Sequence, residues 1–373
     1  MKNLRQRRFW DKTLLLLAAT GIAVGCVGLS CFPAPRFSAV ENRYLADFPT
    51  MTVPGIADGS YATDLDAYAT ERLPARWALR QLRALCQLLE GKCEVGNVLL
   101  CRDGSLAKRI SVNERALGQN LSALQKLKET ATHEQVPFTI AVVPPRILAR
   151  ATVLPGLYQN REIAAALEKL KERLPKTISF PDLTNDDHWY RTDHHWSTAG
   201  AFSAYCTLQR SLGFIPYAQE DFCIEAVSES FYGTSHAAAG IPFITPDVIQ
   251  LYRYAGEDSF SVLLNGKLAP FAGFYDFGKL DTRDGYGVFF GGNYGTLEIT
   301  DGTDRPSLLV IKDSFANALL PFLARHYNVL AVDPRYTTEP LSSFVRQADQ
   351  ILVLVGMQTL CESALLRTLT AGI

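Results

Sequence analysis

Two segments far apart in the chain carry the side chains that nucleophilic catalysis needs. Residues 190–201 contain Asp193, His194 and His195, followed by Trp196, and residues 308–317 contain Ser314. A serine hydroxyl is a weak nucleophile until a neighbouring imidazole takes its proton, and a carboxylate usually orients that imidazole. The residue types therefore predict a hydrolase or acyl-transfer site, on the condition that the two segments meet.

Local spacing suggests a role for each of these residues. Ser314 follows an apolar β-type run and precedes a helix-like segment, a position typical of nucleophiles at the carboxyl end of a buried strand. Asp193 and His195 lie two residues apart, and such residues project to the same side of extended backbone. We therefore expect His195 to be the base and Asp193 to orient it, with His194 pointing the other way.

Oxyanion stabilisation has candidates close to both segments. Backbone N–H groups at the start of the helix after Ser314, including that of Phe315, are aided by the helix dipole. The side-chain amides of Asn317 and Asn293 are candidates for the same role, the latter in a Gly-Gly-Asn-Tyr-Gly stretch.

Two further residues are candidates for substrate binding, and each has a structural alternative. Arg146 follows a predicted strand and Pro-Pro, where it either binds a substrate anion or is solvated. Trp196 stands beside the histidine pair, where packing or helix capping is the alternative. In the same way, Ser314 could be only a helix N-cap.

Metal binding is another alternative, because residues on a loop can face one ion. Its candidate ligands are Asp187, His188, Asp193 and His194. No CxxC pair or His/Cys ligand spacing accompanies them, and we predict neither a metal nor a cofactor.

Apolar runs alternate with helical patterns along much of the chain. Residues 138–143, 308–313, 329–333 and 350–355 are predicted strands, and residues 113–133 and 161–174 are predicted helices. This alternation predicts an α/β fold with a parallel sheet covered by helices on both faces. Residues 215–300 are rich in Gly, Pro, Tyr and Phe, and we expect an irregular insertion with short strands there.

The N-terminus carries a compartment signal. Five basic residues within the first twelve precede residues 13–32, which contain no charge. This pattern predicts a single-pass cell-membrane anchor with the catalytic domain outside the cytoplasm. A cleaved signal peptide or a lipoprotein cysteine at Cys26 are the alternatives. The net charge of −1, with no other basic run, argues against nucleic acid as a partner.

The expected domain organisation follows from these patterns. We predict an anchor at 1–32, a stalk and helical extension at 33–94, and one domain at 95–373 that includes the insertion at 215–300. Six cysteines follow the anchor. Cys86 with Cys93 and Cys206 with Cys223 are possible short-range disulfides, and buried thiols are the equal alternative.

Several separated motifs resemble the DHHW protein family. They are Asp193-His194-His195-Trp196, the Lys-Asp-Ser-Phe-Ala-Asn run from Lys312, Val-Asp-Pro-Arg-Tyr from Val332, residues 38–45 and Phe231-Tyr232-Gly233-Thr234. That family is similar to the SGNH-hydrolase-like domain of alginate O-acetyltransferases. The resemblance implies a flavodoxin-like three-layer fold, permuted because acid and base precede the serine. It places Asp193, His195 and Ser314 on the acid, base and nucleophile.

The leading hypothesis combines the resemblance with the residues. It is an extracytoplasmic O-acetyltransferase or acetylesterase that acts on a cell-envelope or secreted polysaccharide through an acyl-Ser314 intermediate. For transfer, an integral-membrane acyltransferase partner would supply acyl groups. The alternative is a non-catalytic glycan-binding or envelope-assembly protein that retains the fold. In that case aromatic residues of 215–300 would stack on sugars, although they could equally fill the core.

Overall fold

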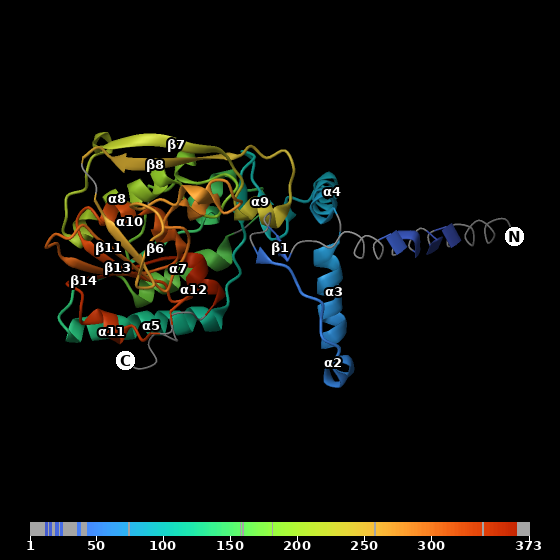
Figure 1. Cartoon of the computed structure of the whole chain (residues 1–373), viewed down its shortest axis with the longest axis horizontal. Coiled ribbons are helices and arrows are strands. Elements are labelled where there is room, and N and C mark those ends of the chain that lie inside the picture. Colours follow the sequence, from blue (N-terminus) through green and yellow to red (C-terminus); the bar gives the residue numbers. More distant parts are fainter. Residues whose placement is uncertain are drawn as a thin grey trace. The chain divides into compact units, whose positions relative to one another are not determined.

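The computed structural model divides the chain into two compact units, residues 1–90 and 91–373 (Figure 1). The described residues are 12, 13, 15, 16, 19–21, 23, 24, 36–38, 43–73, 75–156, 158, 160–180, 182–256, 259–337 and 339–363. Most of the expected anchor at 13–32 lies outside them. Among the described residues, no helix combines the length and the apolar character that a membrane crossing requires.

The first unit contains a short hairpin and three described helices. Strands β1 (Phe37–Ser38) and β2 (Arg43–Tyr44) pair antiparallel, and helices α2 (Val53–Ala57), α3 (Ser60–Arg72) and α4 (Arg76–Leu89) follow. The buried guanidinium of Arg72 donates to the carbonyl of Ala46 and to the carboxylate of Asp47. These bonds fasten the irregular stretch after β2 to the end of α3.

A seven-stranded mixed sheet forms the centre of the second unit, in the order β10-β9-β11-β13-β12-β14-β6. Its strands are β6 (Phe138–Val143), β9 (Ser261–Leu264), β10 (Lys267–Leu268), β11 (Thr296–Thr300), β12 (Ser307–Lys312), β13 (Asn328–Val332) and β14 (Gln350–Gly356). The strands β13, β12, β14 and β6 are parallel, whereas β11, β9 and β10 continue the sheet antiparallel.

The prediction of a parallel sheet is therefore correct for only four strands. Those four have the continuous apolar sequences that burial on both faces requires. Strands β9 and β11 instead alternate buried and partly exposed residues, and they lie within the stretch expected to be an irregular insertion. The short strands expected in this stretch are present, but the sequence did not predict that β9, β10 and β11 extend the central sheet in the antiparallel direction.

Two hydrophobic cores cover the two faces of this sheet. Leu308 and Val310 of β12 belong to one core, and Leu309 and Ile311 belong to the other. Side chains alternate along a strand, so a central strand that is apolar throughout needs cover on both sides. Helices lie on both faces, as predicted (Figure 1).

The first core contains residues of helices α8 (Thr198–Leu212) and α10 (Leu320–Leu323) and of a hairpin made of β7 (Phe222–Phe231) and β8 (Asp247–Tyr254). The second contains residues of helices α5 (Glu114–His133), α7 (Arg161–Arg173), α11 (Ser342–Val345) and α12 (Met357–Glu362). The side chain of Ser197 caps α8, and Gly213 ends it in the left-handed conformation.

Smaller elements surround the sheet. Strands β3 (Glu94–Val95), β4 (Val98–Leu100) and β5 (Leu106–Lys108) form a separate sheet, and α6 (Arg146–Ala149) and α9 (Thr234–Ala239) are short helices. The 3-10 helices are η1 (Ala151–Val153), η2 (Asp186–His188), η3 (Gln219–Asp221), η4 (Phe277–Lys279), η5 (Gly285–Val288) and η6 (Ser314–Ala318).

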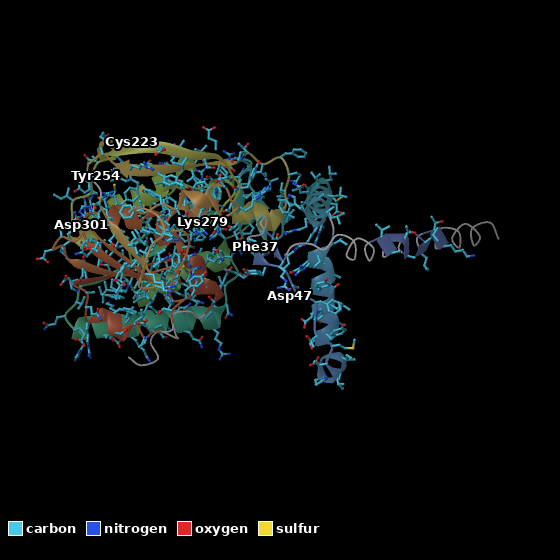
Figure 2. The ribbon with its side chains drawn as sticks, viewed as in Figure 1. Phe37, Asp47, Cys223, Tyr254, Lys279 and Asp301 are labelled. Atoms are coloured by element: carbon cyan, nitrogen blue, oxygen red, sulfur yellow. The ribbon has the colours of Figure 1, made fainter. Side chains whose placement is uncertain are left out.

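The six cysteines after residue 32 are all free thiols. Cys223 on β7 is exposed on the surface (Figure 2), and Cys101 and Cys361 are buried. Neither of the two possible disulfides is formed. The alternative of buried thiols is correct for Cys101 and Cys361, whereas Cys86, Cys93 and Cys223 are exposed.

Candidate active site

Asp193, His195 and Ser314 are hydrogen-bonded in a row. Nδ1 of His195 lies 2.6 Å from Oδ1 of Asp193, and Nε2 lies 2.7 Å from Oγ of Ser314. An ionised carboxylate can only accept, so Nδ1 of His195 carries the proton and Nε2 turns a lone pair toward the serine hydroxyl. This geometry suits proton transfer from the serine to the imidazole. The structure thus brings together the three side chains that we predict as acid, base and nucleophile.

Asp193 and His195 lie on a loop whose two ends are joined to each other and whose tip is anchored to β8. Trp189 and Trp196 form an isolated antiparallel bridge that joins the two ends of the loop. Asp247, at the start of β8, accepts hydrogen bonds from the backbone N–H groups of Arg191 (2.6 Å) and Thr192 (2.8 Å). Burial raises the pKa of Asp247, and these N–H donors oppose that rise. A loop without regular structure is thereby held in one conformation.

Asp193 is fully enclosed, and both of its oxygens are fully used. Oδ1 accepts from the backbone N–H and the ring of His195, and Oδ2 accepts from the backbone N–H (2.7 Å) and the hydroxyl (2.8 Å) of Thr234. Burial opposes ionisation, but the neighbouring imidazoles and these bonds outweigh it and lower the pKa of Asp193 well below its usual range. Gly233 permits this approach, because a Cβ there would lie 2.3 Å from Oδ2 of Asp193.

His194 does not point away from the site, and that expectation is wrong. Its ring centroid lies 3.8 Å from that of His195, and its Nδ1 lies 2.6 Å from the hydroxyl of Thr234. The loop is a series of bends, so the alternation of side chains along extended backbone does not apply. Burial, followed by the charge of His195, lowers the pKa of His194 to about 3, so this ring is neutral at pH 7.

Tyr286 of η5 packs on the ring of His195. The two centroids are 3.9 Å apart and the planes differ by 6°. The phenol also donates to the backbone carbonyl of Ser314 at 3.1 Å. His195 is therefore clamped between His194 and Tyr286. The sequence offered Tyr286 only as one of many aromatic residues in 215–300, with nothing to link it to the base.

Ser314 begins η6 directly after β12, and Asp313 fixes this junction. One carboxylate oxygen of Asp313 accepts from the backbone N–H of Phe315 (3.0 Å), and the other accepts from the N–H of Gly356 (2.7 Å) and the hydroxyl of Thr359 (2.6 Å). The strand ends of β12 and β14 are thus tied together. The N–H of Phe315 is already used, so it does not match the oxyanion role that we expect for it.

Phe315 and Trp196 both support the nucleophile segment. Trp196 is fully buried, and its indole N–H donates to the carbonyl of Phe315 at 2.9 Å. The ring of Phe315 lies 5.1 Å from that of His195. Gly356 leaves room for this ring, since a Cβ there would lie 2.7 Å from it. The structure places Trp196 in the core beside the site, with no face open to a substrate.

The two asparagines that we predict as oxyanion donors differ in their surroundings. Nζ of the buried Lys312 lies 2.6 Å from Oδ1 of Asn317, whose Nδ2 donates to the carbonyl of Gly292 and to Oδ1 of Asn293 (3.1 Å). Asn317 is therefore saturated. Because Oδ1 of Asn293 faces this network, its Nδ2 points outward, and no partner for that group exists among the described residues. Positive φ angles at Gly291 and Gly292 shape the turn that presents it.

Lys312 itself is held in a buried charge network. Its ammonium lies 3.8 Å from Asp333, which also accepts two hydrogen bonds from the guanidinium of Arg335. Burial lowers the pKa of Lys312 to about 8, and the charge of Asp333 opposes that shift. This network fixes the orientation of both asparagines.

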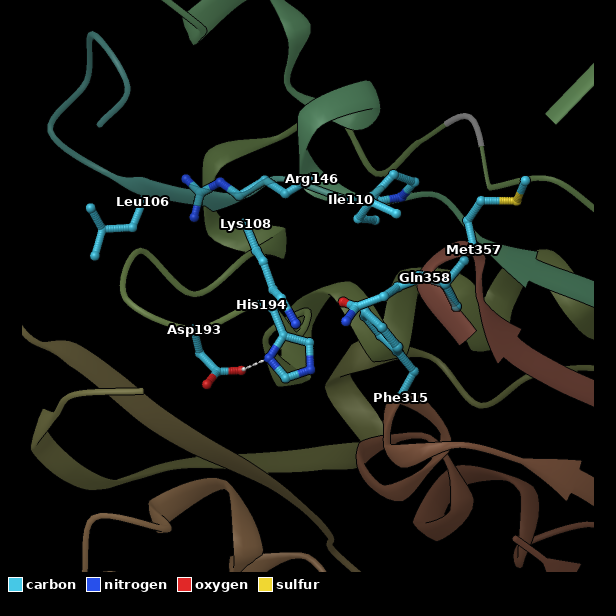
Figure 3. Close-up of a pocket in the computed structure, with 11 residues that line it drawn as sticks. Leu106, Lys108, Ile110, Arg146, Asp193, His194, Phe315, Met357 and Gln358 are labelled. Atoms are coloured by element: carbon cyan, nitrogen blue, oxygen red, sulfur yellow. Dashed lines mark ion pairs between the residues drawn. The ribbon is translucent and has the colours of Figure 1, made fainter. Parts of the chain in front are cut away.

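Arg146 is neither solvated nor directed at the nucleophile. Its side chain is buried, donates to the carbonyl of Tyr190, and lies 3.9 Å from the carboxylate of Asp103. Figure 3 shows its guanidinium pointing away from His194. Arg146 therefore fastens two loops near the site.

Metal ligation has one geometric candidate among the described residues. Donor atoms of Asp193, His194 and His195 lie within 4.8 Å of one another. However, both ring nitrogens of His195 and Nδ1 of His194 are already hydrogen-bonded. The ligand set considered from the sequence is not assembled, since Asp187 and His188 do not join this group.

Comparisons with known proteins identify relatives of this chain. The family model described as DHHW protein matches residues 104–332. A crystal structure of a DHHW family protein from Eubacterium siraeum is 19% identical, with a TM-score of 0.63, over 74% of this chain and 95% of that one. Bacillus cereus PatB1 is 18% identical, with a TM-score of 0.59, over 72% of this chain and 98% of that one.

PatB1 has also been solved with a sulfonyl adduct, and that structure has a TM-score of 0.58. The O-acetyltransferase domain of Pseudomonas putida AlgJ is 15% identical over 71% of this chain and 92% of that one, and its TM-score of 0.43 is too low to establish a shared fold. No curated protein sequence matches the chain. At these identities, the solved structures establish a common α/β fold for this chain, the E. siraeum protein and PatB1.

Proposed function

The chain belongs to the DHHW protein family. From that premise we propose that it is a serine-dependent acyl-transfer enzyme that works through an acyl-Ser314 intermediate. The observation that carries this proposal is the continuous row from Asp193 through His195 to Ser314, with contacts of 2.6 and 2.7 Å. A packing role alone does not require a partly exposed serine at the end of such a row.

The proposed reaction has two half-reactions. In the first, Nε2 of His195 takes the proton of Ser314 as Oγ attacks the carbonyl carbon of an acyl ester. The carboxylate of Asp193 stabilises the imidazolium that forms, and Nδ2 of Asn293 is the side-chain donor proposed for the oxyanion. His195 then protonates the departing alcohol, which leaves the acyl group on Ser314.

The second half-reaction transfers the acyl group. A sugar hydroxyl or water gives its proton to His195 while its oxygen attacks the acyl-serine, and the proton then returns to Ser314. Clamping of the imidazole between His194 and Tyr286 keeps it aligned through both steps. The sulfonyl adduct known for PatB1 supports a test of the same chemistry here, since sulfonylation is typical of activated nucleophiles.

The proposed substrate is an O-acetylated or acetylatable polysaccharide of the cell envelope or of a secreted matrix. The family resemblance supports it, together with the basic and apolar N-terminus that favours a membrane-anchored, extracytoplasmic protein. For transfer, an integral-membrane acyltransferase that delivers acyl groups is part of the proposal. Several aromatic residues considered for sugar stacking are buried, namely Phe231, Phe274, Tyr286, Phe289 and Phe290. Their burial weakens the alternative of a purely glycan-binding protein.

The test uses the purified full-length protein, p-nitrophenyl acetate and a fluorophosphonate probe. We expect ester hydrolysis and covalent labelling in the wild type, and loss of both in Ser314→Ala. His195→Ala should reduce both by several orders of magnitude, because the serine then has no base. Labelling that persists in Ser314→Ala would refute the assigned nucleophile. Equal silence of the wild type and both variants would refute the enzymatic proposal.

A further inference from the structure

Helix α4 is amphipathic, and its apolar side is turned outward. The side chains of Leu79, Leu82 and Leu89 are 48%, 57% and 88% exposed, and Cys86 is exposed between them. Spacings of three and four residues place these four side chains in one stripe along the helix. An amphipathic helix of a globular protein normally buries such a stripe in the core. An exposed stripe instead marks a surface that binds a protein or a membrane.

The basic residues of α4 form a second row beside this apolar stripe. Arg76, Arg80 and Arg83 are four and three residues apart, so they also share one side of the helix. The helix contains no Asp or Glu. The whole chain, by contrast, has 37 basic and 38 acidic residues. The surface of α4 thus combines an apolar stripe with a positive charge that no acidic residue of the helix balances.

This combination fits a lipid bilayer with anionic headgroups. A helix that lies in the membrane interface turns its leucine-rich side toward the acyl chains and its basic residues toward the headgroups. Arginine side chains are long enough to keep the guanidinium among the headgroups while the neighbouring leucines leave water. Anionic headgroups also attract basic residues close to the membrane surface. The stripe and the row of arginines therefore match the two layers that such a helix meets.

The place of α4 in the chain supports the same partner. It belongs to the unit of residues 1–90, whose sequence begins with the basic and apolar segment that predicts a membrane anchor. An anchor keeps the following residues near lipid, so even a weakly binding helix meets a high local concentration of it. A second copy of the chain fits less well. In a symmetric dimer the same surface meets itself, and the surface of α4 offers no acidic residue to pair with its arginines.

We propose that α4 docks on the bilayer as an interfacial helix, with its leucine stripe at the boundary of the acyl chains and its arginines among anionic headgroups. This contact goes beyond the acyl-transfer function and is additional to the predicted anchor. An anchor alone leaves the following chain free to rotate above the membrane, whereas a second contact holds the N-terminal unit against its surface.

The test uses the full-length protein in vesicles of two parts phosphatidylcholine and one part phosphatidylglycerol. An environment-sensitive maleimide dye is attached to Cys86, within the stripe, after the other accessible cysteines are replaced by alanine. A second preparation carries the dye at Cys223, which is exposed on β7 on the same side of the strand as Glu225. We expect the dye at Cys86 to shift its emission to the blue and to be quenched by a doxyl-labelled lipid. The dye at Cys223 should show neither effect.

Two substitutions at exposed positions of α4 separate the apolar and the charged contributions. Leu82→Ser should lower the ratio of docked to undocked helix about 10- to 100-fold, because one leucine no longer leaves water. Arg83→Gln should lower it about fivefold in these vesicles and leave it unchanged in pure phosphatidylcholine. Ile215→Ser, at an apolar residue of the other unit that is 87% exposed, is the matched control and should change nothing.

Three results would each overturn the proposal. The first is a dye at Cys86 that stays in water. The second is a blue-shifted dye that the doxyl lipid does not quench, since the stripe would then pack on protein. The third is equal quenching at Cys86 and Cys223, which would mean unspecific adsorption. None of these results depends on the reactivity of Ser314, so fluorophosphonate labelling judges the proposed function separately.

Discussion

The polar groups on the two sides of His195 differ in how completely they are hydrogen-bonded. On the loop side, the carboxylate of Asp193 has a donor for each hydrogen-bonding position, and Asp247 pins the loop that carries it. On the open side, where Lys108 of β5 extends toward the ring of His194 (Figure 3), the ammonium of Lys108 and Nε2 of His194 have no protein partner among the described residues. Nδ2 of Asn293, in the turn before β11, has none among them either. Saturated groups can only hold geometry, whereas unsaturated groups near a nucleophile can bind what arrives there. His194 belongs to both sides, because its Nδ1 contacts the hydroxyl of Thr234 and its Nε2 has no partner among the described residues.

The largest effect is expected for Asp193→Asn, which changes the central group of the fully hydrogen-bonded side. One hydrogen-bonding position of the amide must then present N–H to a donor, and the tautomer of His195 is no longer enforced. We expect the rate of fluorophosphonate labelling to fall by about 10⁴-fold, as in the corresponding change in serine proteases. The matched control is Asp187→Asn on the same chain segment, where the side chain is 74% exposed. Similar labelling of both variants would contradict the role of Asp193.

Asn317 and Asn293 extend the comparison. The side chain of Asn317 is fully hydrogen-bonded, whereas Nδ2 of Asn293 has no partner among the described residues. Asn293→Ala should lower kcat by about 10²- to 10³-fold, the usual effect of removing one oxyanion donor. Its loss of stability should be smaller than that of Asn317→Ala, because it removes only the longer contact of the Lys312 ammonium, 3.4 Å to Oδ1 of Asn293, and leaves the 2.6 Å contact to Asn317 in place. Asn317→Ala should instead lower the free energy of unfolding by about 1–3 kcal/mol, since the buried ammonium of Lys312 loses its 2.6 Å acceptor. Steady-state kinetics and urea unfolding of both variants decide this. The reverse pattern would assign the oxyanion contact to Asn317.

Gly233→Ala tests how tightly the saturated side is packed. A Cβ at this position would lie 2.3 Å from Asp193, so the carboxylate or the α9 segment must shift. We expect a loss of about 1–3 kcal/mol in unfolding free energy together with reduced labelling. Gly118→Ala on α5 is the matched control, because no atom lies within 4 Å of the added Cβ.

For Gly118→Ala the helix propensity of alanine should raise stability by about 0.5–1 kcal/mol. Thermal unfolding of the two variants gives the comparison directly. Equal effects of the two substitutions would mean that the space around Asp193 does not constrain the site.

The smallest expected effect concerns the pH dependence of stability. The pKa of His194 is lowered to about 3 in the folded protein, against about 6.5 when it is unfolded. Between these values the unfolded chain binds a proton that the folded chain does not. The unfolding free energy therefore falls as the pH drops below about 6.5, by at most about 1.4 kcal/mol per pH unit for this residue.

Urea unfolding at pH 7, 6 and 5 measures that slope. His194→Gln should make it shallower. His236 and His326, whose pKa values burial lowers to about 4, should preserve the remainder. An unchanged slope in His194→Gln would mean that the pKa of His194 is the same in the folded and the unfolded protein, which would refute the lowered pKa.

Sequence reasoning selected the members of the Asp193–His195–Ser314 row because their chemistry is local. A serine after an apolar run and an acid near a histidine are visible without knowledge of what packs nearby. The reasoning on His194 failed because it assumed extended backbone. The bridge between Trp189 and Trp196, with Asp247 holding the tip, bends the loop so that both imidazoles lie on the same side.

Residues that reach the site only through long-range contacts could not be identified from the sequence. Tyr286 reaches His195 across 91 residues of sequence, and Lys108 extends toward His194 from a strand of a separate small sheet (Figure 3). In the same way, the antiparallel strands β9 and β11 were hidden in a stretch that reads as irregular. Strands that alternate buried and partly exposed residues leave a weaker pattern than strands buried on both faces.

The amino-acid sequence by itself determined the α/β class, the four parallel strands and the candidate acid, base and nucleophile, because apolar periodicity and side-chain chemistry are properties of short segments. Only the tertiary structure decided which polar groups are saturated and which remain open. It thereby separated Asn293 from Asn317 and brought Lys108 to His194. The physical reason is that hydrogen-bond satisfaction depends on partners from distant segments, and folding alone brings those partners within reach.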